Sequence, residues 1–378
     1  MRHGFVGCFF GDMAYGFWTF FSNLLVKKTN LKTIIILNIL WIKFLQSYLK
    51  LGFKFYYRKA SAIYLEKIPK DKAILFLGNH QNALLDPLLL TVKSNRINHF
   101  LTRAAVFKNL TVSKILNSVQ MLPVYRMIDG VNTIQKNKPI FRFCTQLLRD
   151  KKSIVLFPEG SHSLLRKVRP LKKGAARIIE ETLQNYPTTE ILIIPVGVNY
   201  QSPTRYGDSM SVYFCHHISP NNYWNGTNLD MQGLNKELSE NLKTLTTHIK
   251  SSSDYDISLK KLEKLKVYFT SPIEVNECLK NNFKYSGKKE QTSVVFLMMS
   301  FLIKLFYFIP YLIWKKVAYP KIKEKEFVGT FRYALIITLA TLHLLLMTVL
   351  LSIVLGKNIG LITLAIGILL PLITLRAK

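Results

Sequence analysis

Two long apolar runs near the carboxyl end constrain this chain most. Tyr333–Leu355 is a run of 23 residues without a formal charge, and Ile359–Leu375 is a second run of 17. A helix rises about 1.5 Å per residue and a bilayer core is about 30 Å thick, so the first run is long enough to span and the second is near the short limit. Gly356-Lys357-Asn358 between them is typical of a turn. The sequence therefore predicts a transmembrane helical hairpin.

Basic residues beside the hairpin predict its orientation. Arg332 precedes the first run, and Arg376 and Lys378 follow the second. Positive charge favours the cytoplasmic side of a membrane, so both ends of the hairpin are expected there and the Gly356 turn outside. We therefore predict a protein of the cytoplasmic membrane whose active site faces the cytosol. Further upstream lie more lysines: Lys315, Lys316, Lys321, Lys323 and Lys325.

Two other segments are apolar without being simple spans. Val294–Trp314 carries Lys304 near its centre and Pro310 within it, so we expect an interfacial or re-entrant helix with the lysine reaching the headgroups. Near the amino end, Lys43, Ser47, Lys50 and Lys54 recur at helical spacing. This stripe predicts an amphipathic helix on the membrane; an ordinary surface helix packed on a core is the alternative. Residues 1–30 are expected to be a poorly ordered extension.

The charge of the chain limits its partners. The 378 residues hold 52 Lys+Arg against 22 Asp+Glu, a net charge of +30. Nucleic acid or an anionic membrane could explain this, and the apolar segments favour the membrane. The sequence has neither a basic-aromatic RNA-binding motif nor zinc-finger spacing, so we predict no nucleic-acid partner. We also predict no metal and no bound cofactor, because the cysteines lack metal-ligand spacing: Cys8, Cys144, Cys215 and Cys278.

The middle of the chain alternates apolar runs with helical patterns, which predicts an α/β fold with a mostly parallel sheet flanked by helices. The expected strands are Ala73–Leu77, His99–Thr102, Met121–Tyr125, Ser153–Phe157 and Ile191–Val198. Three helices are expected: one that begins at Pro87, one over Ile140–Arg149 and one over Gly174–Leu183. Residues 230–266 are polar and helical, and Tyr268–Val275 is expected to add a last strand.

Four regions follow from these patterns. Residues 1–59 are an extension with a membrane-anchoring helix, and 60–220 form the α/β domain. Residues 221–290 are a helical appendage, and 291–378 form a membrane segment.

Two short motifs follow expected strands, where open α/β sheets place their chemistry. One is Asn79-His80 with Asp86-Pro87 after it, and the other is Phe157-Pro158-Glu159-Gly160. A histidine acts as a general base when a carboxylate holds its other ring nitrogen. Six residues of one helix turn through roughly 600°, so His80 can meet Asp86 only from a turn before the helix. Asp86 is then a helix cap, an orienting acid, or both, while His80 alone could be structural.

At these residues the sequence resembles the glycerolipid (lysophospholipid) acyltransferases. Asn79, His80 and Asp86 correspond to the first motif of that family, and Phe157–Gly160 matches the third in full. Met121–Arg126 resembles the second motif and Ile193–Val198 the fourth. The resemblance covers roughly residues 60–220.

The sequence departs from the family pattern at three places, one of which is Gln120, where the second motif usually opens with a glycine. Five residues separate His80 from Asp86, where the family more often has four. Ser161-His162-Ser163 stands where the family usually has Thr-Arg-Ser, so the usual arginine is absent and a neighbouring basic residue could supply its charge. The basic candidates nearby are His162, Arg166, Arg169, Lys172 and Lys173.

The resemblance implies a glycerolipid acyltransferase-like fold and an O-acyltransferase. His80, oriented by Asp86, would deprotonate a substrate hydroxyl, which attacks the thioester of acyl-CoA or acyl carrier protein. The acceptor would be lysophosphatidate or glycerol 3-phosphate. Arg126 would bind its phosphate. The acceptor pocket would include Glu159, Gly160, Ser161 and Lys173, although Glu159 has a purely structural alternative as a buried carboxylate paired with a neighbouring Arg or Lys.

Three other functions stay open at the level of sequence. The acceptor could be another lysolipid or an aminolipid, or the chain could be a non-catalytic protein that binds anionic lipids. A hydrolase fits less well, because the chain has no Gly-x-Ser-x-Gly elbow. The sequence does not specify the acyl donor, the acyl chain length or the oligomeric state.

Overall fold

A seven-stranded sheet forms the centre of the molecule, with strand order β1-β7-β6-β2-β5-β3-β4. The computed structural model describes residues 31–126, 133–250, 253–290 and 293–377. Neighbouring strands run parallel, except that β6 and β7 are antiparallel. The strands are β1 (Lys59–Tyr64), β2 (Ala73–Gly78), β3 (Asn98–Arg103), β4 (Met121–Val124), β5 (Ser153–Leu156), β6 (Ile191–Tyr200) and β7 (Ser209–Phe214).

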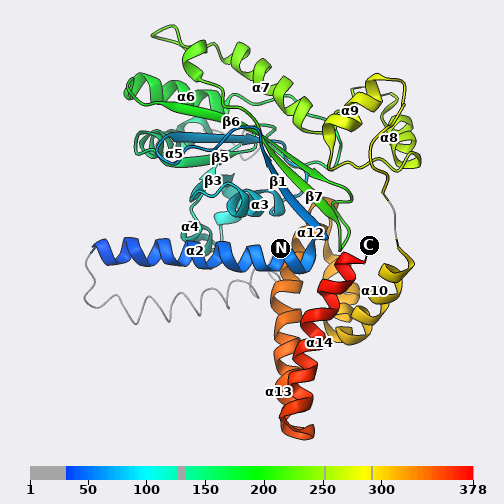
Figure 1. The fold of residues 1–378 in the computed structure, drawn as a ribbon. Helices are drawn as coiled ribbons and strands as arrows, with labels where there is room; N and C mark the ends of the chain where they lie inside the picture. Colours follow the sequence, from blue (N-terminus) through cyan, green and yellow to red (C-terminus); the bar gives the residue numbers. More distant parts are fainter. Residues whose placement is uncertain (1–30, 127–132, 251–252, 291–292, 378) are drawn as a thin grey trace.

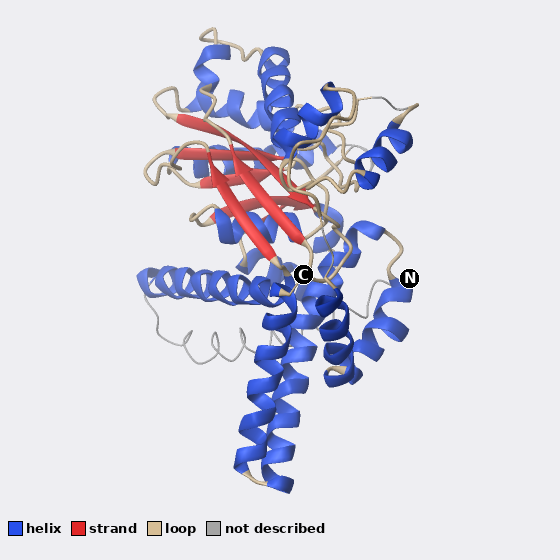
Figure 2. Ribbon diagram, turned by 45° about the vertical axis from the view of Figure 1, so that its right-hand side comes forward, coloured by secondary structure: helices blue, strands red, loops and turns tan. Residues whose placement is uncertain are grey.

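Helices cover both faces of this sheet, and a helical hairpin projects away from it (Figures 1 and 2). The helices of the upper part are α2 (Leu31–Tyr56), α3 (Leu85–Lys93), α4 (Leu110–Ser118), α5 (Thr133–Arg149), α6 (Gly174–Asn185), α7 (Met231–Leu245), α8 (Tyr255–Lys264) and α9 (Pro272–Lys280). The carboxyl-terminal part consists of α10 (Val294–Phe306), α11 (Phe308–Leu312), α12 (Val328–Leu335), α13 (Thr341–Leu355) and α14 (Lys357–Arg376), with π-helical turns η4 (Ile313–Ala318) and η7 (Ile336–Ala340).

The central strand β2 is buried on both faces, because side chains of a strand alternate between the two sides. Ile74 and Phe76 join a core cluster with the end of α2, with α3 and with Tyr333 of α12. Leu75 and Leu77 join a second cluster with α5, α6 and α7. The predicted α/β fold with a mostly parallel sheet is thus confirmed.

Three strand assignments differ from the sequence-based prediction. β1 and β7 were missed: β1 begins with a lysine, and β7 alternates Ser209 and Ser211 with apolar residues, so neither is a continuous apolar run. The strand expected at Tyr268–Val275 is wrong. The chain turns there, with Ser271 N donating to Tyr268 O at 2.8 Å, and α9 begins at Pro272. Proline suits a first helical turn, since the N–H that it lacks would have no partner there.

The expected helical appendage is divided between two cores. Leu234, Leu238 and Leu242 of α7 belong to the cluster on the sheet, so this helix is part of the α/β layer. α8 and α9 form a satellite cluster around Leu262 and Val275.

The carboxyl-terminal hairpin contains two helices that are long and apolar enough to cross a membrane, Lys325–Leu355 and Lys357–Arg376. Gly356 joins them with a φ of +95°, a conformation that glycine adopts without strain. Both ends of the hairpin lie beside the sheet domain, and the Gly356 turn lies at the far tip (Figure 1). The protein is therefore membrane-associated, with its sheet domain on the side of the hairpin ends.

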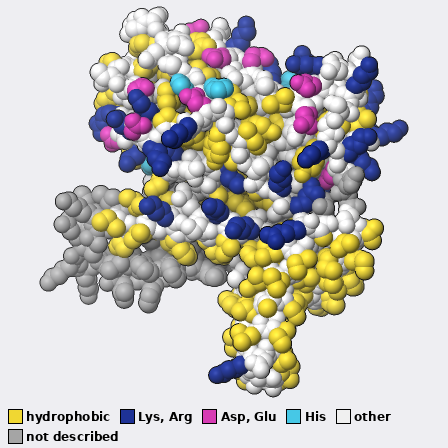
Figure 3. Space-filling view, viewed as in Figure 1, with side chains coloured by type: hydrophobic (Ala, Val, Ile, Leu, Met, Phe, Trp, Pro, Cys, Tyr) yellow, Lys and Arg dark blue, Asp and Glu magenta, His cyan; other side chains and the backbone are white. Residues whose placement is uncertain are grey.

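Two further helices border the hairpin base. α10 and the helical segment Phe308–Lys321 meet at a bend of 98°, a geometry that fits either a broken span or the re-entrant element expected at Val294–Trp314. α2 lies across the direction of the hairpin, and the lysines of its predicted stripe, Lys43, Lys50 and Lys54, are all exposed. Basic side chains form a belt between the mixed upper surface and the apolar hairpin (Figure 3). The expectation for residues 1–30 lies outside the described residues.

A substitution in β6 tests the packing of α7 on the sheet. A Cβ at Gly197 would lie 2.3 Å from Leu245 O, a backbone atom, so Gly197→Ala is expected to lower the free energy of unfolding by about 1–3 kcal/mol. Chemical denaturation in detergent measures the effect. Gly174→Ala is the control, because a Cβ there would meet nothing within 4 Å. Equal stability of the two variants would contradict close packing of Leu245 in α7 on Gly197 in β6.

Candidate active site

His80 and Asp86 meet although they are not on one helix face. His80 lies in the turn after β2, and Asp86 lies in the first turn of α3. His80 Nδ1 is 2.8 Å from Asp86 Oδ2, and the side chain of Asp86 is fully buried. This is the turn-plus-helix geometry that the six-residue spacing requires.

The carboxylate of Asp86 also holds the turn that carries His80. Its Oδ2 accepts hydrogen bonds from Gln81 N and Asn82 N, each at 2.8 Å. Its Oδ1 accepts one from Tyr200 Oη at 2.6 Å. The N-cap of α3 is Leu84, which makes no side-chain cap bond, so Asp86 braces the preceding turn instead of capping the helix.

Asn79 attaches the same turn to the neighbouring strand. Its side-chain amide donates to Val198 O at 3.0 Å, and its Oδ1 accepts from Val198 N at 2.7 Å. Both backbone groups of Val198 in β6 are thereby paired with the first motif. The segment that begins the predicted motif is buried and rigidly anchored to the sheet.

The two motifs singled out by the sequence meet at His80. β2 and β5 are paired neighbours in the sheet, so the loops after them start side by side. The ring of Phe157 stacks on His80 with 4.2 Å between ring centroids, and Ser163 N donates to His80 O at 2.9 Å. The loop that begins with the Phe157–Gly160 motif thus packs against one face of the His80 ring.

Arg169 holds the loop of the third motif. Its guanidinium donates to both Glu159, at 2.5 Å from Nη2 to Oε2, and Ser161, at 2.6 Å from Nη1 to Oγ. Arg169 N donates to the other oxygen of Glu159 at 3.1 Å. Glu159 is buried, so its carboxylate is engaged in the structural pairing that was the alternative for this residue.

The remaining candidates of this loop differ in accessibility. Gly160 has a φ of +78°, and Lys172 packs against it and donates its N–H to Pro158 O at 2.8 Å. Lys173 is exposed at the start of α6. Arg166 is buried and donates to Tyr200 O and Gln201 O, each at 3.0 Å, so it supplies a structural contact.

Arg126 lies at the end of β4, within electrostatic range of His162. The end of that strand is fixed by Asn137, whose side chain exchanges two hydrogen bonds with the backbone of Tyr125 at 2.8 and 2.7 Å. Arg126 is half-buried. The structure therefore places its charge on the side of the site where His162 lies.

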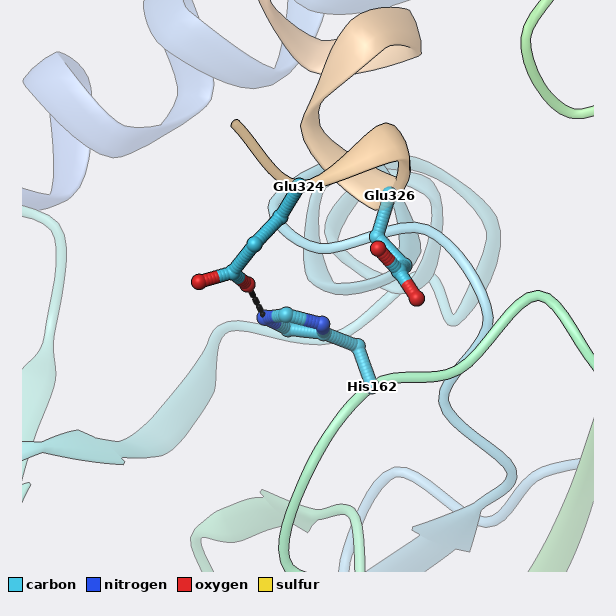
Figure 4. A group of neighbouring side chains, drawn as sticks. All are labelled: His162, Glu324 and Glu326. Atoms are coloured by element: carbon cyan, nitrogen blue, oxygen red, sulfur yellow. Dashed lines mark ion pairs between the residues drawn. The ribbon is translucent and has the colours of Figure 1, made fainter. Parts of the chain in front are cut away.

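His162 connects the site to the membrane segment. Its ring lies 5.7 Å from that of His80 and 5.0 Å from that of Phe327. His162 Nε2 is 3.5 Å from Glu324 Oε2, and Glu326 points toward the same imidazole (Figure 4). One possible ligand atom from each of these three side chains lies within 4.8 Å of the others, a grouping that the sequence did not reveal. Glu324 is largely exposed, and its contact with His162 is an ion pair when the imidazole is protonated.

Tyr200 is the functional candidate that sequence reasoning missed. It is fully buried at the carboxyl end of β6, two residues beyond the fourth motif, and it donates to Asp86. Burial and the nearby charge of Asp86 raise the pKa of Tyr200 well above its usual value, so the phenol stays protonated. A tyrosine in an apolar strand has no distinctive sequence signal, since it equally fits an ordinary core.

Acidification tests the environment of His162. Burial lowers the pKa of His162, the charge of His80 and Arg126 lowers it further, and Glu324 and Glu326 partly oppose this. Because its pKa is lowered in the folded state, His162 takes up a proton more readily in the unfolded chain. The folded state therefore keeps its full stability above a pH of about 6.5, where His162 is neutral in both states, and loses part of it as the pH falls below that value. His162→Gln is expected to reduce the loss of thermal stability between about pH 7.5 and pH 5.5. Identical losses in both proteins would contradict this environment.

Comparisons with known proteins relate part of the chain to a family and to solved structures. A search of the curated proteins finds no match. Among solved structures, the chain is similar to the crystal structure of the 1-acyl-sn-glycerophosphate (LPA) acyltransferase PlsC from Thermotoga maritima, with 18% identity and a TM-score of 0.45 over 61% of this chain and 86% of that chain. The Acyltransferase family model matches residues 61–199, which include His80, Asp86 and the Phe157–Gly160 motif. The resemblance seen in the sequence is confirmed for this segment: residues 61–199 form an acyltransferase domain.

Proposed function

We propose that the protein transfers a fatty acyl group from an acyl thioester to a hydroxyl of a glycerolipid precursor, with His80 as general base. The observation that carries this proposal is the 2.8 Å contact of His80 Nδ1 with a buried carboxylate that is itself fixed by two backbone amides and Tyr200. Acyl transfer as the reaction class follows from the family.

The hydrogen bonds favour one tautomer of His80. A carboxylate only accepts hydrogen bonds, so its contact with Nδ1 assigns the ring proton to that nitrogen. Nε2 then presents its lone pair. Within the described part of the chain, Nε2 makes no hydrogen bond, and the ring is held against Phe157. His80 is thus arranged to take a proton from a substrate hydroxyl.

The reaction then needs no acyl-enzyme. As Nε2 takes the hydroxyl proton, the acceptor oxygen attacks the thioester carbonyl carbon and forms a tetrahedral oxyanion. Collapse of this intermediate breaks the C–S bond, and the leaving thiolate takes the proton from the imidazolium. Asp86 stabilises the imidazolium between these steps.

The acceptor is lysophosphatidate or glycerol 3-phosphate in this proposal. Arg126 binds its phosphate, since a guanidinium offers two donors to phosphate oxygens. Lys173 adds positive charge at the loop of the third motif. Gly160 and Ser161 shape the pocket, and Glu159 acts through Arg169, which it fixes.

The reaction takes place at the cytosolic surface of the membrane in this proposal. The lysines of α2 are exposed beside the base of the hairpin, and the site lies on the same side as the hairpin ends. Arg332 and Arg376 mark those ends as the cytoplasmic ones by the positive-inside rule. The acyl donor, acyl-CoA or acyl carrier protein, would reach the site from the cytosol.

An acyl-transfer assay with purified protein tests the proposal. Native protein in detergent is offered acyl-CoA or acyl carrier protein thioesters with lysophosphatidate, glycerol 3-phosphate and acceptors without a phosphomonoester. His80→Ala is expected to lower kcat by a factor on the order of 10²–10⁴, since general-base catalysis contributes about that much. Absence of acyl transfer by the native protein from any thioester would refute the proposal, and preference for a phosphate-free acceptor would refute the assigned acceptor.

A second variant tests Tyr200 as a positioning residue. Tyr200→Phe removes a hydrogen bond to the Asp86 carboxylate and is expected to lower kcat by about tenfold or more with little change in KM. Tyr57→Phe is the matched control, because the buried hydroxyl of Tyr57 has no hydrogen-bond partner within the described residues. If both variants retain the native kcat, Tyr200 has no part in orienting the pair.

A further inference from the structure

A cavity of about 610 Å³ lies at the base of the carboxyl-terminal hairpin. Such a volume is typical of sites for small organic ligands, about 300–1,000 Å³. α2, α10–α14 and η7 form its walls, which are mainly apolar, and no Asp or Glu is among the described residues that line it. The apolar side chains include Leu51, Ile336, Leu344 and Ile368.

None of the lining residues belongs to the part of the chain that matches the family. They come from residues 48–55, Tyr206 and residues 300–371, whereas the match covers residues 61–199. The cavity is therefore a product of the membrane segment and its packing on α2. Neither the family match nor the motifs assign it a role.

Helix α12 connects this cavity to the loop of His80. At its first turn, Thr330 Oγ1 accepts a hydrogen bond from Leu84 N at 3.2 Å. A Cβ at Gly329 would lie 2.9 Å from Asn82 Nδ2, so the helix touches the turn that Asp86 braces. Ile336 lines the cavity six residues beyond Thr330, a rise of about 9 Å along a helix. A ligand chain in the cavity and a headgroup near His80 can therefore belong to one molecule.

The polar groups of the cavity suit an anionic lipid. Arg332 and Lys304 both line it, and the guanidinium of Arg332 lies 4.7 Å from the ring of Trp314. The hydroxyl of Ser300 is buried in the same wall, and within the described residues it has no hydrogen-bond partner.

We propose that this cavity binds the acyl chain of a single-chain lysophospholipid acceptor whose phosphate lies outside it, toward Arg126, while Arg332 and Lys304 give the cavity a positive charge that favours an anionic lipid. This inference rests on the proposed function and selects the membrane-borne acceptor over water-soluble glycerol 3-phosphate. The walls are membrane-segment helices, so the occupant comes from the bilayer and not from the soluble thioester donor.

Cavity-filling variants test the inference. Ser300→Phe and Ala340→Phe place a ring in the cavity, whereas Met298→Phe and Leu342→Phe introduce the same residue at exposed positions of the same helical segments. The filling variants are expected to lower kcat/KM for long-chain lysophosphatidate by about tenfold or more, because several methylenes lose their apolar surroundings. Short-chain lysophosphatidate should remain a substrate, which also shows that the variants fold. The two control variants should keep the native kcat/KM for both long-chain and short-chain lysophosphatidate.

Two outcomes of the kinetic test would overturn the inference. One is an equal loss for short and long acceptors, which would mean that the cavity holds no acceptor chain. The other is a changed preference for donor chain length with an unchanged preference for acceptor chain length, which would assign the cavity to the donor.

A binding experiment separates this inference from the proposed function. Lysophosphatidate with a photoreactive diazirine at the end of its chain is crosslinked to the His80→Ala protein, and the labelled peptides are identified by mass spectrometry. Label on residues 48–55, 294–318, 328–345 or 364–371 supports the inference, and label confined to residues 61–199 overturns it. If the membrane segment is labelled but the native protein transfers no acyl group, the binding site stands and the proposed function fails.

Discussion

The site depends on one buried carboxylate. Asp86 accepts hydrogen bonds from Gln81 N, Asn82 N and Tyr200 Oη, and it contacts His80 Nδ1. Burying a carboxylate is costly unless donors replace its water, and here all these donors come from the site itself. The turn, the end of β6 and the histidine are therefore fixed by the same interaction. The geometry of the candidate site and the local fold are inseparable at this point of the chain.

A buried carboxylate also holds the third motif, in the loop after the neighbouring strand β5. Arg169 pairs with Glu159 and holds Ser161, so the loop after β5 keeps its shape and Phe157 its place against His80. The glutamate of the third motif thus holds the loop through its pairing with Arg169. The arginine that the motif lacks is not simply replaced by a neighbour: Arg166 is buried against backbone carbonyls, while His162 faces the membrane segment.

The membrane segment is part of the same assembly. α12 begins beside Asn82 and Leu84 and continues into the span, while Tyr333 donates to Leu49 O of α2 at 2.8 Å. Anchoring and chemistry therefore share one helix. An enzyme that takes an acceptor from the bilayer gains from this arrangement, because the reacting hydroxyl is presented at the level where the lipid resides.

The sequence by itself determined the α/β fold, the hairpin, the exposed lysine stripe of α2 and the pairing of His80 with Asp86, because each has a local pattern: an apolar period, a charge-free run or a motif spacing. It could not determine β1 or β7, whose polar residues hide the strand period, or the helix that starts at Pro272. Only the tertiary structure decided that Tyr200 holds Asp86, that Arg169 takes Glu159, and that α2 and the hairpin enclose a cavity. These contacts depend on how the elements pack in three dimensions. The spacing of residues along the chain therefore does not reveal which side chains will meet.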